Sequence, residues 1–158
     1  GADCDLEIGE IHDPETHLIP LILQVASKKR KKITIHGDDY NTLDGTCIRD
    51  FVRVTDLATA HCLALQHLQV HDCNPVYNLG AGHGLSIRQV IKAAEHVTGQ
   101  NISHEMGRRR KGDPACLIAD GSRAKSELGW QPAYKDITAI IETAWKWHCK
   151  CLDASITS

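Results

Sequence analysis

The chain has 158 residues, of which 42% are hydrophobic, 24% are charged and 4% are aromatic. This length suits one domain with a mainly aliphatic core, and the composition excludes a disordered chain. A net charge of -2 with a pI near 6.6 gives no general attraction to nucleic acid or to an anionic membrane, so neither is expected as a partner.

The apolar runs, the first residues and the cysteines indicate the cellular compartment in which the chain is expected. No apolar run approaches the length of a membrane-spanning helix, and the first residues lack a signal-peptide pattern. Because the sequence begins at Gly1 without a methionine, we interpret it as starting within a longer polypeptide. The seven cysteines include no Cys-x-x-Cys pair, which favours reduced thiols in the cytoplasm and predicts no metal site.

The first elements are a helix and a short strand. Apolar residues recur at helical spacing over residues 18–27, and the basic run 28–32 that follows suits a solvated helix end. No aromatic residues are interleaved with this run, which argues against a nucleic-acid role. Residues 33–36 predict a strand, and residues 37–46 a turn-rich loop.

The stretch 44–57 is the most informative of the sequence. Arg49 stands between two apolar positions near a glycine-containing loop, where its guanidinium suits an anionic ligand such as a phosphate. An ordinary strand-to-helix junction with a surface arginine is the alternative, and spacing alone favours this alternative. Thr55 or Asp56 is predicted to cap a helix over residues 57–69 whose apolar residues lie on one side.

A glycine loop lies in the middle of the chain. Residues 76–79 predict a strand that leads into residues 80–84, which read Gly-Ala-Gly-His-Gly. This spacing departs from the Gly-x-Gly-x-x-Gly of dinucleotide sites, so we interpret the glycines as room for a tight turn. Ser86 and Gln89 predict a capping box that begins a helix, and Gly99 predicts its end.

The last third continues the alternation of short strands and helices. Residues 102–104 and 117–119 predict extended segments on either side of a basic loop, in which Arg109 is expected to be solvated. A helix is predicted to Leu128 and another over residues 137–149. We assign residues 1–150 to one α/β domain and residues 151–158 to a frayed tail. The strands are few and short, so we expect helix 57–69 and strand 76–79 to pack on a domain outside this chain.

Motifs over nearly the whole chain match one known family in order and spacing. They include His17-Leu18-Ile19-Pro20, Asp44-Gly45-Thr46-Cys47-Ile48-Arg49-Asp50, Tyr77-Asn78-Leu79-Gly80 and Arg109-Arg110-Lys111-Gly112-Asp113-Pro114. On these residues the chain resembles the UDP-glucose 4-epimerases (UDP-galactose 4-epimerases) of the extended short-chain dehydrogenase/reductase superfamily. The match covers the C-terminal, substrate-binding half of such an enzyme, so the resemblance implies an α/β substrate domain with short strands and several helices.

The resemblance also implies what this chain lacks. In the family an N-terminal Rossmann domain binds NAD and carries a Tyr-x-x-x-Lys pair, whereas no tyrosine here has a lysine four residues on. The parent polypeptide is therefore expected to be an isomerase with NAD as its cofactor. This chain alone is expected to hold no catalytic residue, no cofactor-binding residue and no activity. Its expected partners are a UDP-sugar, the missing Rossmann half and a second copy of itself.

Substrate-binding roles are implied by the same resemblance. Arg49 and Arg110 would approach the diphosphate, and Asp113 would accept hydrogen bonds from the ribose hydroxyls. The remaining positions are His17 and Leu18 near the diphosphate and uracil, Thr34, Ile35 and His36 lining the uracil with backbone groups, and Leu117 beside the sugar.

Two features leave the specificity open. Family members often have an aromatic residue at the position of His36, so this sequence departs from the pattern there. A residue as large as Leu117 favours UDP-glucose and UDP-galactose over N-acetylated sugars. The alternatives are another sugar-nucleotide epimerase or dehydratase of the superfamily, or a noncatalytic UDP-binding or docking module.

Overall fold

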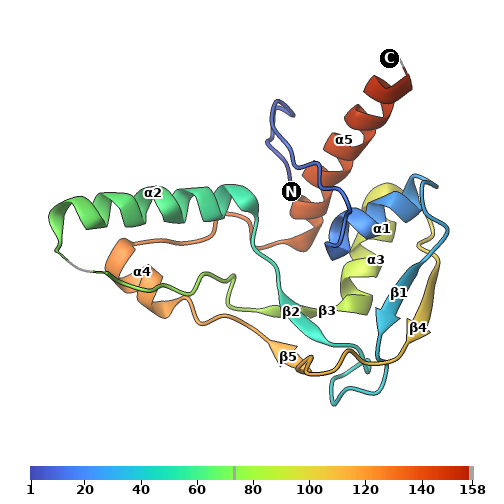
Figure 1. Cartoon of the computed structure of the whole chain (residues 1–158), viewed down its shortest axis with the longest axis horizontal. Helices are drawn as coiled ribbons and strands as arrows, with labels where there is room; N and C mark the ends of the chain where they lie inside the picture. The colour runs from blue at the N-terminus through green and yellow to red at the C-terminus, as the bar shows by residue number, and fades with distance from the viewer. Residues whose placement is uncertain (73, 157–158) are drawn as a thin grey trace.

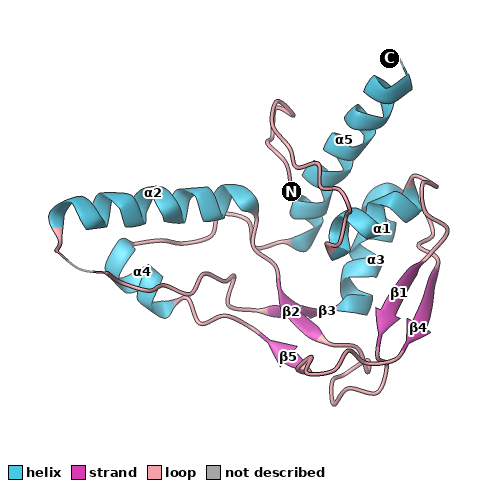
Figure 2. Cartoon of the chain, in the orientation of Figure 1, coloured by secondary structure: helices cyan, strands magenta, loops and turns pink. Residues whose placement is uncertain are grey.

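The computed structural model describes residues 1–72 and 74–156, in an α/β arrangement of five helices and five short strands (Figures 1 and 2). The helices are α1 (Leu18–Ala26), α2 (Val54–Val70), α3 (Ile87–Thr98), α4 (Ser122–Leu128) and α5 (Ile137–Ile156). The strands are β1 (Ile33–His36), β2 (Ile48–Asp50), β3 (Gly84–Ser86), β4 (His104–Gly107) and β5 (Cys116–Leu117). A body formed by α1, α3, α5, β1 and β4 lies on one side, and α2 and α4 form an arm on the other (Figure 1).

The body is held together by an aliphatic core. Ile22 of α1, Val90 of α3 and Ile141 of α5 are fully buried in one cluster, which also takes in Ile35 of β1. The helical spacing of apolar residues places each of these side chains on the inner face of its helix. The predicted helix 18–27 and strand 33–36 are therefore confirmed to within one residue.

The ends of α3 follow the predicted chemistry. The Ser86 hydroxyl accepts a hydrogen bond from the Gln89 amide (3.1 Å), and the Gln89 side chain accepts one from the Ser86 amide (2.8 Å). Gly99 closes the helix in the left-handed region at φ 65°. The capping box and the glycine stop are thus both confirmed.

Two small sheets organise the strands. β1 pairs in parallel with β4, while β2 lies between β3, to which it is antiparallel, and β5, to which it is parallel. The register sets Arg49 opposite Leu85 on one side and opposite Leu117 on the other. Arg49 therefore occupies the centre of the three-stranded sheet, with Leu117 on the neighbouring strand.

Several element boundaries differ from the prediction. Residues 76–79 are not a strand, because no strand of the described residues lies beside them; β3 pairs with β2 instead. β4 starts at His104, since Ile102 is buried and donates its amide to the Glu95 carboxylate (3.0 Å) rather than to a ladder. Helix α5 continues to Ile156, beyond the predicted end at Cys149, so the start of the expected frayed tail is helical.

The predicted cap of α2 was wrong. The helix begins at Val54, and Arg53 holds the capping position without a side-chain cap. Asp56 is buried instead, where its carboxylate accepts hydrogen bonds from the amides of Ala133 (2.9 Å) and Tyr134 (3.1 Å). This carboxylate ties the start of α2 to the segment that leads into α5, a contact that no local pattern predicts.

The apolar side of α2 is largely exposed. Leu65 is 60% exposed, Leu68 46% and Val70 75%, and nearby Val76 is 77% exposed. A small cluster formed by Ala60, Ala124 and Trp130 is the buried part of the arm. The exposure of Leu65 and Leu68 fits the expectation that this helix packs on a domain outside the chain.

Asp44 gives the loop before β2 a dependence on pH. Its carboxylate accepts hydrogen bonds from the Thr46 amide (2.9 Å), the Thr46 hydroxyl (2.7 Å) and the Ser86 hydroxyl (2.5 Å). Burial acts to raise the pKa of Asp44, but the hydrogen bonds from Ser86 and Thr46 outweigh it and lower that pKa. The stability from this carboxylate is thus present above its ordinary pKa of 3.8 and is lost as the pH falls towards the lowered value.

We therefore expect Asp44→Asn to destabilise the chain more at pH 7 than at pH 3. Its free energy of unfolding should be about 1–3 kcal/mol below that of the unsubstituted chain at neutral pH, because an amide cannot accept all three bonds. Urea unfolding at pH 7, 5 and 3 measures this, with the exposed Asp72→Asn as the control. A difference that stays constant across the three pH values would contradict it.

Candidate functional site

Arg49 and Asp113 form the centre of the candidate site. The Arg49 Nη2 donates to Asp113 Oδ1 at 2.5 Å, and Nη1 donates to the Ile48 carbonyl oxygen at 2.6 Å. The two side chains are 20% and 28% exposed, so the pair is partly shielded from water but still reachable. A guanidinium held in this way keeps unused donors for an anion that approaches from solvent.

A tight turn brings Arg110 to the same place. The Asp113 amide donates to the Arg110 carbonyl oxygen (3.2 Å), and Gly112 between them adopts φ +82°, where glycine avoids the strain of a side chain. Arg110 itself is exposed. The turn therefore holds the backbone of Arg110 close to Asp113, and Arg49, Arg110 and Asp113 together carry one net positive charge.

Leu117 completes this group of predicted residues. It lies on β5 directly opposite Arg49 and is 59% exposed. The structure therefore brings Arg49, Arg110, Asp113 and Leu117 together, from β2, β5 and the turn between β4 and β5. We call these four residues the Arg49 cluster. It offers two cations for an anionic group, a carboxylate that accepts from hydroxyls, and an apolar contact.

The predicted residues of β1 border the loop of this cluster. His36 Nδ1 lies 3.4 Å from the Arg108 carbonyl oxygen, and the Thr34 hydroxyl donates to the Glu105 carboxylate (3.2 Å). Ile35 is only 2% exposed and packs in the core, so its side chain does not face a ligand. β1 pairs only with β4 in the described residues, which leaves its other edge without a strand partner.

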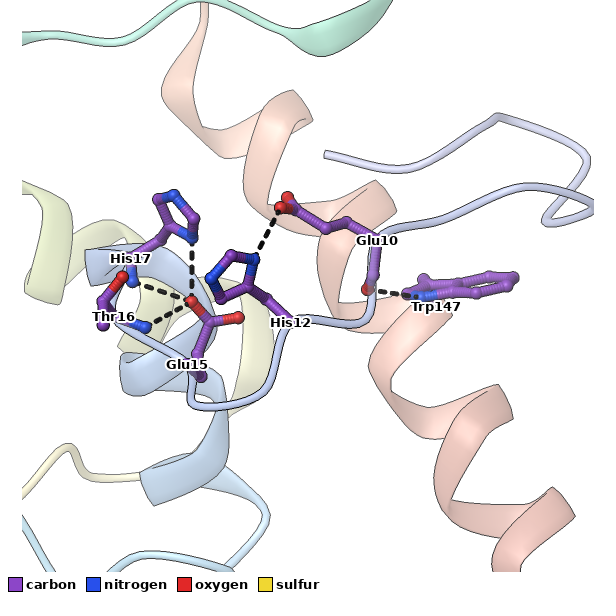
Figure 3. A network of polar contacts seen from close by, with 6 residues as sticks. All are labelled: Glu10, His12, Glu15, Thr16, His17 and Trp147. Atoms are coloured by element: carbon purple, nitrogen blue, oxygen red, sulfur yellow. Dashed lines mark hydrogen bonds and ion pairs between the residues drawn. The ribbon is translucent and has the colours of Figure 1, made fainter.

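His17 and Leu18 stand at the start of α1. The backbone amide of His17 and its Nδ1 both contact Glu15 Oε1, at 2.7 and 2.9 Å, as Figure 3 shows. Leu18 packs against the core. In the part of the chain that is described, no polar contact joins His17 to the Arg49 cluster, so the structure does not bring these two groups into contact.

The same loop gathers three potential metal ligands. Ligand atoms of Glu10, His12 and His17 lie within 4.8 Å of one another, and His12 Nδ1 is 3.8 Å from Glu10 Oε1 (Figure 3). All three side chains are exposed, and Glu15 already pairs with His17 Nδ1. Exposed groups of this kind are common without a metal ion, so these three side chains do not by themselves indicate a metal site.

No pattern in the sequence predicts the contact between Tyr40 and Arg109. The Arg109 guanidinium lies 4.1 Å above the Tyr40 ring and its Nε pairs with Asp39 at 2.5 Å, while 43% of the Arg109 side chain is exposed to solvent, as expected. Burial raises the pKa of Tyr40, and the nearby negative charge of Asp113 adds to the increase. These contacts join the loop that contains Arg109 to the loop that follows β1. An open hollow of about 570 Å³ adjoins them, between Gly37 and Met106.

The glycine loop does not fit a dinucleotide. The carboxylate of Asp50 accepts hydrogen bonds from the amides of Ala81 (3.0 Å) and Gly82 (3.3 Å). A side chain at Gly80 would approach Asp50 Oδ2 within 2.5 Å. The amides that would bind a pyrophosphate already donate to the Asp50 carboxylate, so these residues do not fit NAD. The glycines instead provide room for a turn.

Comparison with known proteins shows the family of the chain. The family model described as GDP-mannose 4,6 dehydratase matches residues 9–143. The chain belongs to this family. It is 53% identical over 148 residues to a UDP-glucose 4-epimerase of Lacticaseibacillus casei, covering 94% of this chain and 45% of that relative.

Solved structures agree with the sequence comparison. A crystal structure of a UDP-glucose 4-epimerase is 52% identical with a TM-score of 0.91, covering 95% of this chain and 46% of that one. A second, from Bifidobacterium longum in complex with NAD+ and UDP, is 38% identical with a TM-score of 0.86, covering 95% and 44%. The resemblance to UDP-glucose 4-epimerases and the α/β substrate-domain fold are thereby confirmed.

The chain spans about 45% of the length of the relatives that it matches. Within the described residues, none of the helices combines the length and apolar character needed to cross a membrane. Cys4, Cys47, Cys62, Cys116 and Cys149 are free thiols. The domain limits and the individual roles of the site residues stay predictions.

Proposed function

We propose that this chain is the UDP-sugar-binding half of an NAD-dependent UDP-glucose 4-epimerase that interconverts UDP-glucose and UDP-galactose. The observation that carries the proposal is the Arg49 cluster, which unites two guanidinium groups, a carboxylate and an apolar side chain on one surface. Support comes from the relatives, which are named UDP-glucose 4-epimerases, and from the neighbour whose crystal structure contains NAD+ and UDP.

The chemistry of each group suits a nucleotide diphosphate. Arg49 and Arg110 would offset the diphosphate charge, and Asp113 would accept hydrogen bonds from the ribose hydroxyls. Since Asp113 is paired with Arg49 in this structure, one oxygen of Asp113 stays available for a hydroxyl while the other holds the guanidinium. The free edge of β1 would contact the uracil, with His17 and Leu18 near the uracil and diphosphate.

The epimerase reaction suits an enzyme in which one half binds the nucleotide and the other half carries out the chemistry. The reaction removes hydride from C4 of the sugar, lets the 4-keto sugar turn, and returns hydride to the other face. The active site must bind the nucleotide firmly while the reacting sugar ring stays free to turn. Residues that contact the nucleotide, away from the reacting carbon, can supply this binding energy. In this proposal the chain binds the nucleotide. Leu117 borders the sugar and disfavours N-acetylated substrates. NAD and the proton-transfer residues belong to the other half.

A segment exchange tests the proposal. This chain would replace the matching 148-residue segment of the Lacticaseibacillus casei relative, and conversion of UDP-galactose to UDP-glucose would be measured. We expect an active chimera, because the two segments share 53% of their residues, and no activity from this chain alone. A folded chimera that neither turns over UDP-galactose nor binds UDP would overturn the proposal.

The matched family model gives a second candidate. Its description names GDP-mannose 4,6 dehydratase, so a dehydratase acting on another sugar nucleotide shares the scaffold. Titration of the chimera with GDP beside UDP separates the two candidates. Tighter binding of GDP, together with loss of water from a GDP-sugar, would favour the dehydratase.

The exposed face of α2 predicts self-association of the isolated chain. In the complete enzyme we propose that this face packs on the NAD-binding half; without that half, Leu65, Leu68 and Val70 are exposed. Apolar patches of this kind favour association, so we expect dimers or larger species in sedimentation experiments.

A matched pair of variants tests this origin of the association. Leu65→Lys with Leu68→Lys should shift the chain to monomer, whereas Gln66→Lys with Gln69→Lys adds equal charge to the same helix and should not. A chain without substitutions that sediments as a clean monomer would contradict the prediction.

A further inference from the structure

Arg53 is a buried cation that forms no ion pair within the described residues. Its side chain is 0% exposed, and its guanidinium lies 3.7 Å from the centre of the Tyr134 ring. Nη2 donates to the Ala2 carbonyl oxygen at 2.7 Å, while Nε and Nη1 have no hydrogen-bond partner among the residues described. No carboxylate in that part of the chain forms an ion pair with it. A buried charge in this state favours an anion beside it.

The group that this guanidinium faces is the thiol of Cys4. Nη2 of Arg53 is 3.2 Å from Cys4 Sγ, and the Tyr134 hydroxyl is 3.5 Å from the same sulfur. Cys4 is nevertheless exposed, so a reagent in solvent reaches the sulfur. Two donors from separate parts of the fold, the start of α2 and the segment before α5, therefore converge on one accessible sulfur.

The surroundings of Cys4 stabilise its thiolate. The hydrogen bond with Tyr134 and then that with Arg53 lower the pKa of Cys4. Partial desolvation, and after it the nearby negative charge of Asp3, oppose them with smaller effects. Reactive cysteines in proteins share this combination of exposure and an adjacent cation.

Four other cysteines, Cys47, Cys62, Cys116 and Cys149, lack this combination. Burial raises the pKa of Cys47 and that of Cys149. Cys62 on α2 and Cys116 on β5 are exposed, but neither has a hydrogen bond to a cationic side chain in the described part of the chain. They are therefore internal references for a thiol that is accessible without the arginine.

We propose that Cys4 is a reactive thiol and the preferred site at which peroxides and small electrophiles modify this chain. With hydrogen peroxide, the thiolate sulfur attacks one oxygen, an S–O bond forms and the O–O bond breaks. The sulfur is oxidised by two electrons, the peroxide is reduced, and the hydroxide that leaves takes a proton to become water. A small thiol then displaces the sulfenic hydroxyl as water and leaves a mixed disulfide. Arg53 holds the thiolate before the reaction and loses this contact after it.

Alkylation kinetics test the proposal on the chain itself. Iodoacetamide labelling, followed by peptide mass spectrometry, gives a separate rate for each cysteine. At pH 7 we expect Cys4 to react at least about five-fold faster than Cys62 and Cys116, because its thiolate is more populated. At pH 10 this advantage should largely disappear, since all exposed thiols are then ionised. After limited hydrogen peroxide, a sulfenic-acid probe should label Cys4 first.

Variants separate the role of the neighbours from simple exposure. Tyr134→Phe removes one donor and keeps the ring, so the Cys4 rate at pH 7 should fall about three-fold. Tyr77→Phe removes a phenol from the arm and should leave it unchanged. Arg53→Met should bring Cys4 to the rate of Cys62, and unchanged protection of buried Cys47 would show that the variant is folded. Equal rates for Cys4, Cys62 and Cys116 at pH 7, or an advantage that persists at pH 10, would overturn the proposal.

Discussion

Replacing Arg49 with methionine is expected to weaken UDP binding to the chimeric enzyme by about 10- to 100-fold, with a matching loss of turnover. Methionine keeps most of the apolar stem of arginine but removes the guanidinium that would contact the diphosphate. A charge-assisted hydrogen bond contributes about 1.5–3 kcal/mol, and each 1.4 kcal/mol changes an equilibrium constant about ten-fold. Isothermal titration with UDP measures the loss directly.

The position of Arg49 makes this effect larger than that of other arginines. It lies at the centre of the three-stranded sheet, and its Nη1 and Nη2 are already oriented by the Ile48 carbonyl oxygen and Asp113. A group that is oriented before binding loses little conformational entropy when the ligand arrives. Arg110 lies on an exposed turn without this support, so Arg110→Met should weaken binding less.

Two further variants decide between a specific contact and a general charge effect. Arg30→Met removes the same charge from the exposed run after α1 and should leave UDP binding within about two-fold. Arg49→Lys keeps the charge without the planar fork and should recover only part of the affinity. Equal weakening by Arg30→Met and Arg49→Met would show that Arg49 has no direct contact with the nucleotide.

The features that the sequence could predict are those set by neighbouring residues. The capping box of Ser86 and Gln89 and the stop at Gly99 depend on residues within one helix. The apolar face of α1 depends on spacing alone. The motif resemblance predicted the family and the α/β fold, because motif order reports ancestry even where local propensity is weak. The pairing of Arg49 with Asp113 joins two of these motifs, although neither motif reveals that pairing by itself.

The features that could not be predicted depend on contacts far apart in the sequence. The Arg109 stack on Tyr40 joins positions that no periodicity relates, and burial of Asp56 depends on two amides before α5. Residues 76–79 have the composition of a strand, but the described chain has no strand beside them. Strand formation needs such a partner, which a local pattern cannot supply.

Trp130 is the residue whose loss should destabilise the fold most. It is 2% exposed, packs with Ala60 of α2 and Ala124 of α4, and donates its indole N–H to the Asp56 carbonyl oxygen at 2.8 Å. Trp130→Ala removes the largest side chain of this cluster and leaves a cavity, so we expect a loss of about 3–5 kcal/mol in the free energy of unfolding of the arm. Urea unfolding and hydrogen exchange measure it, with the half-buried Trp147→Ala as the control at about 1 kcal/mol.

The helices that lose hydrogen-exchange protection in Trp130→Ala should show whether the arm and the body unfold separately. The cluster around Trp130 shares no residue with the core around Ile22, Val90 and Ile141, so the arm has its own apolar centre. Regions with separate cores open with separate free energies. Amides of α2 and α4 in Trp130→Ala should therefore exchange fast while those of α3 keep their protection. Equal loss of protection in α3 would instead show that the arm and the body unfold as one unit, through the hydrogen bonds of Asp56 to Ala133 and Tyr134.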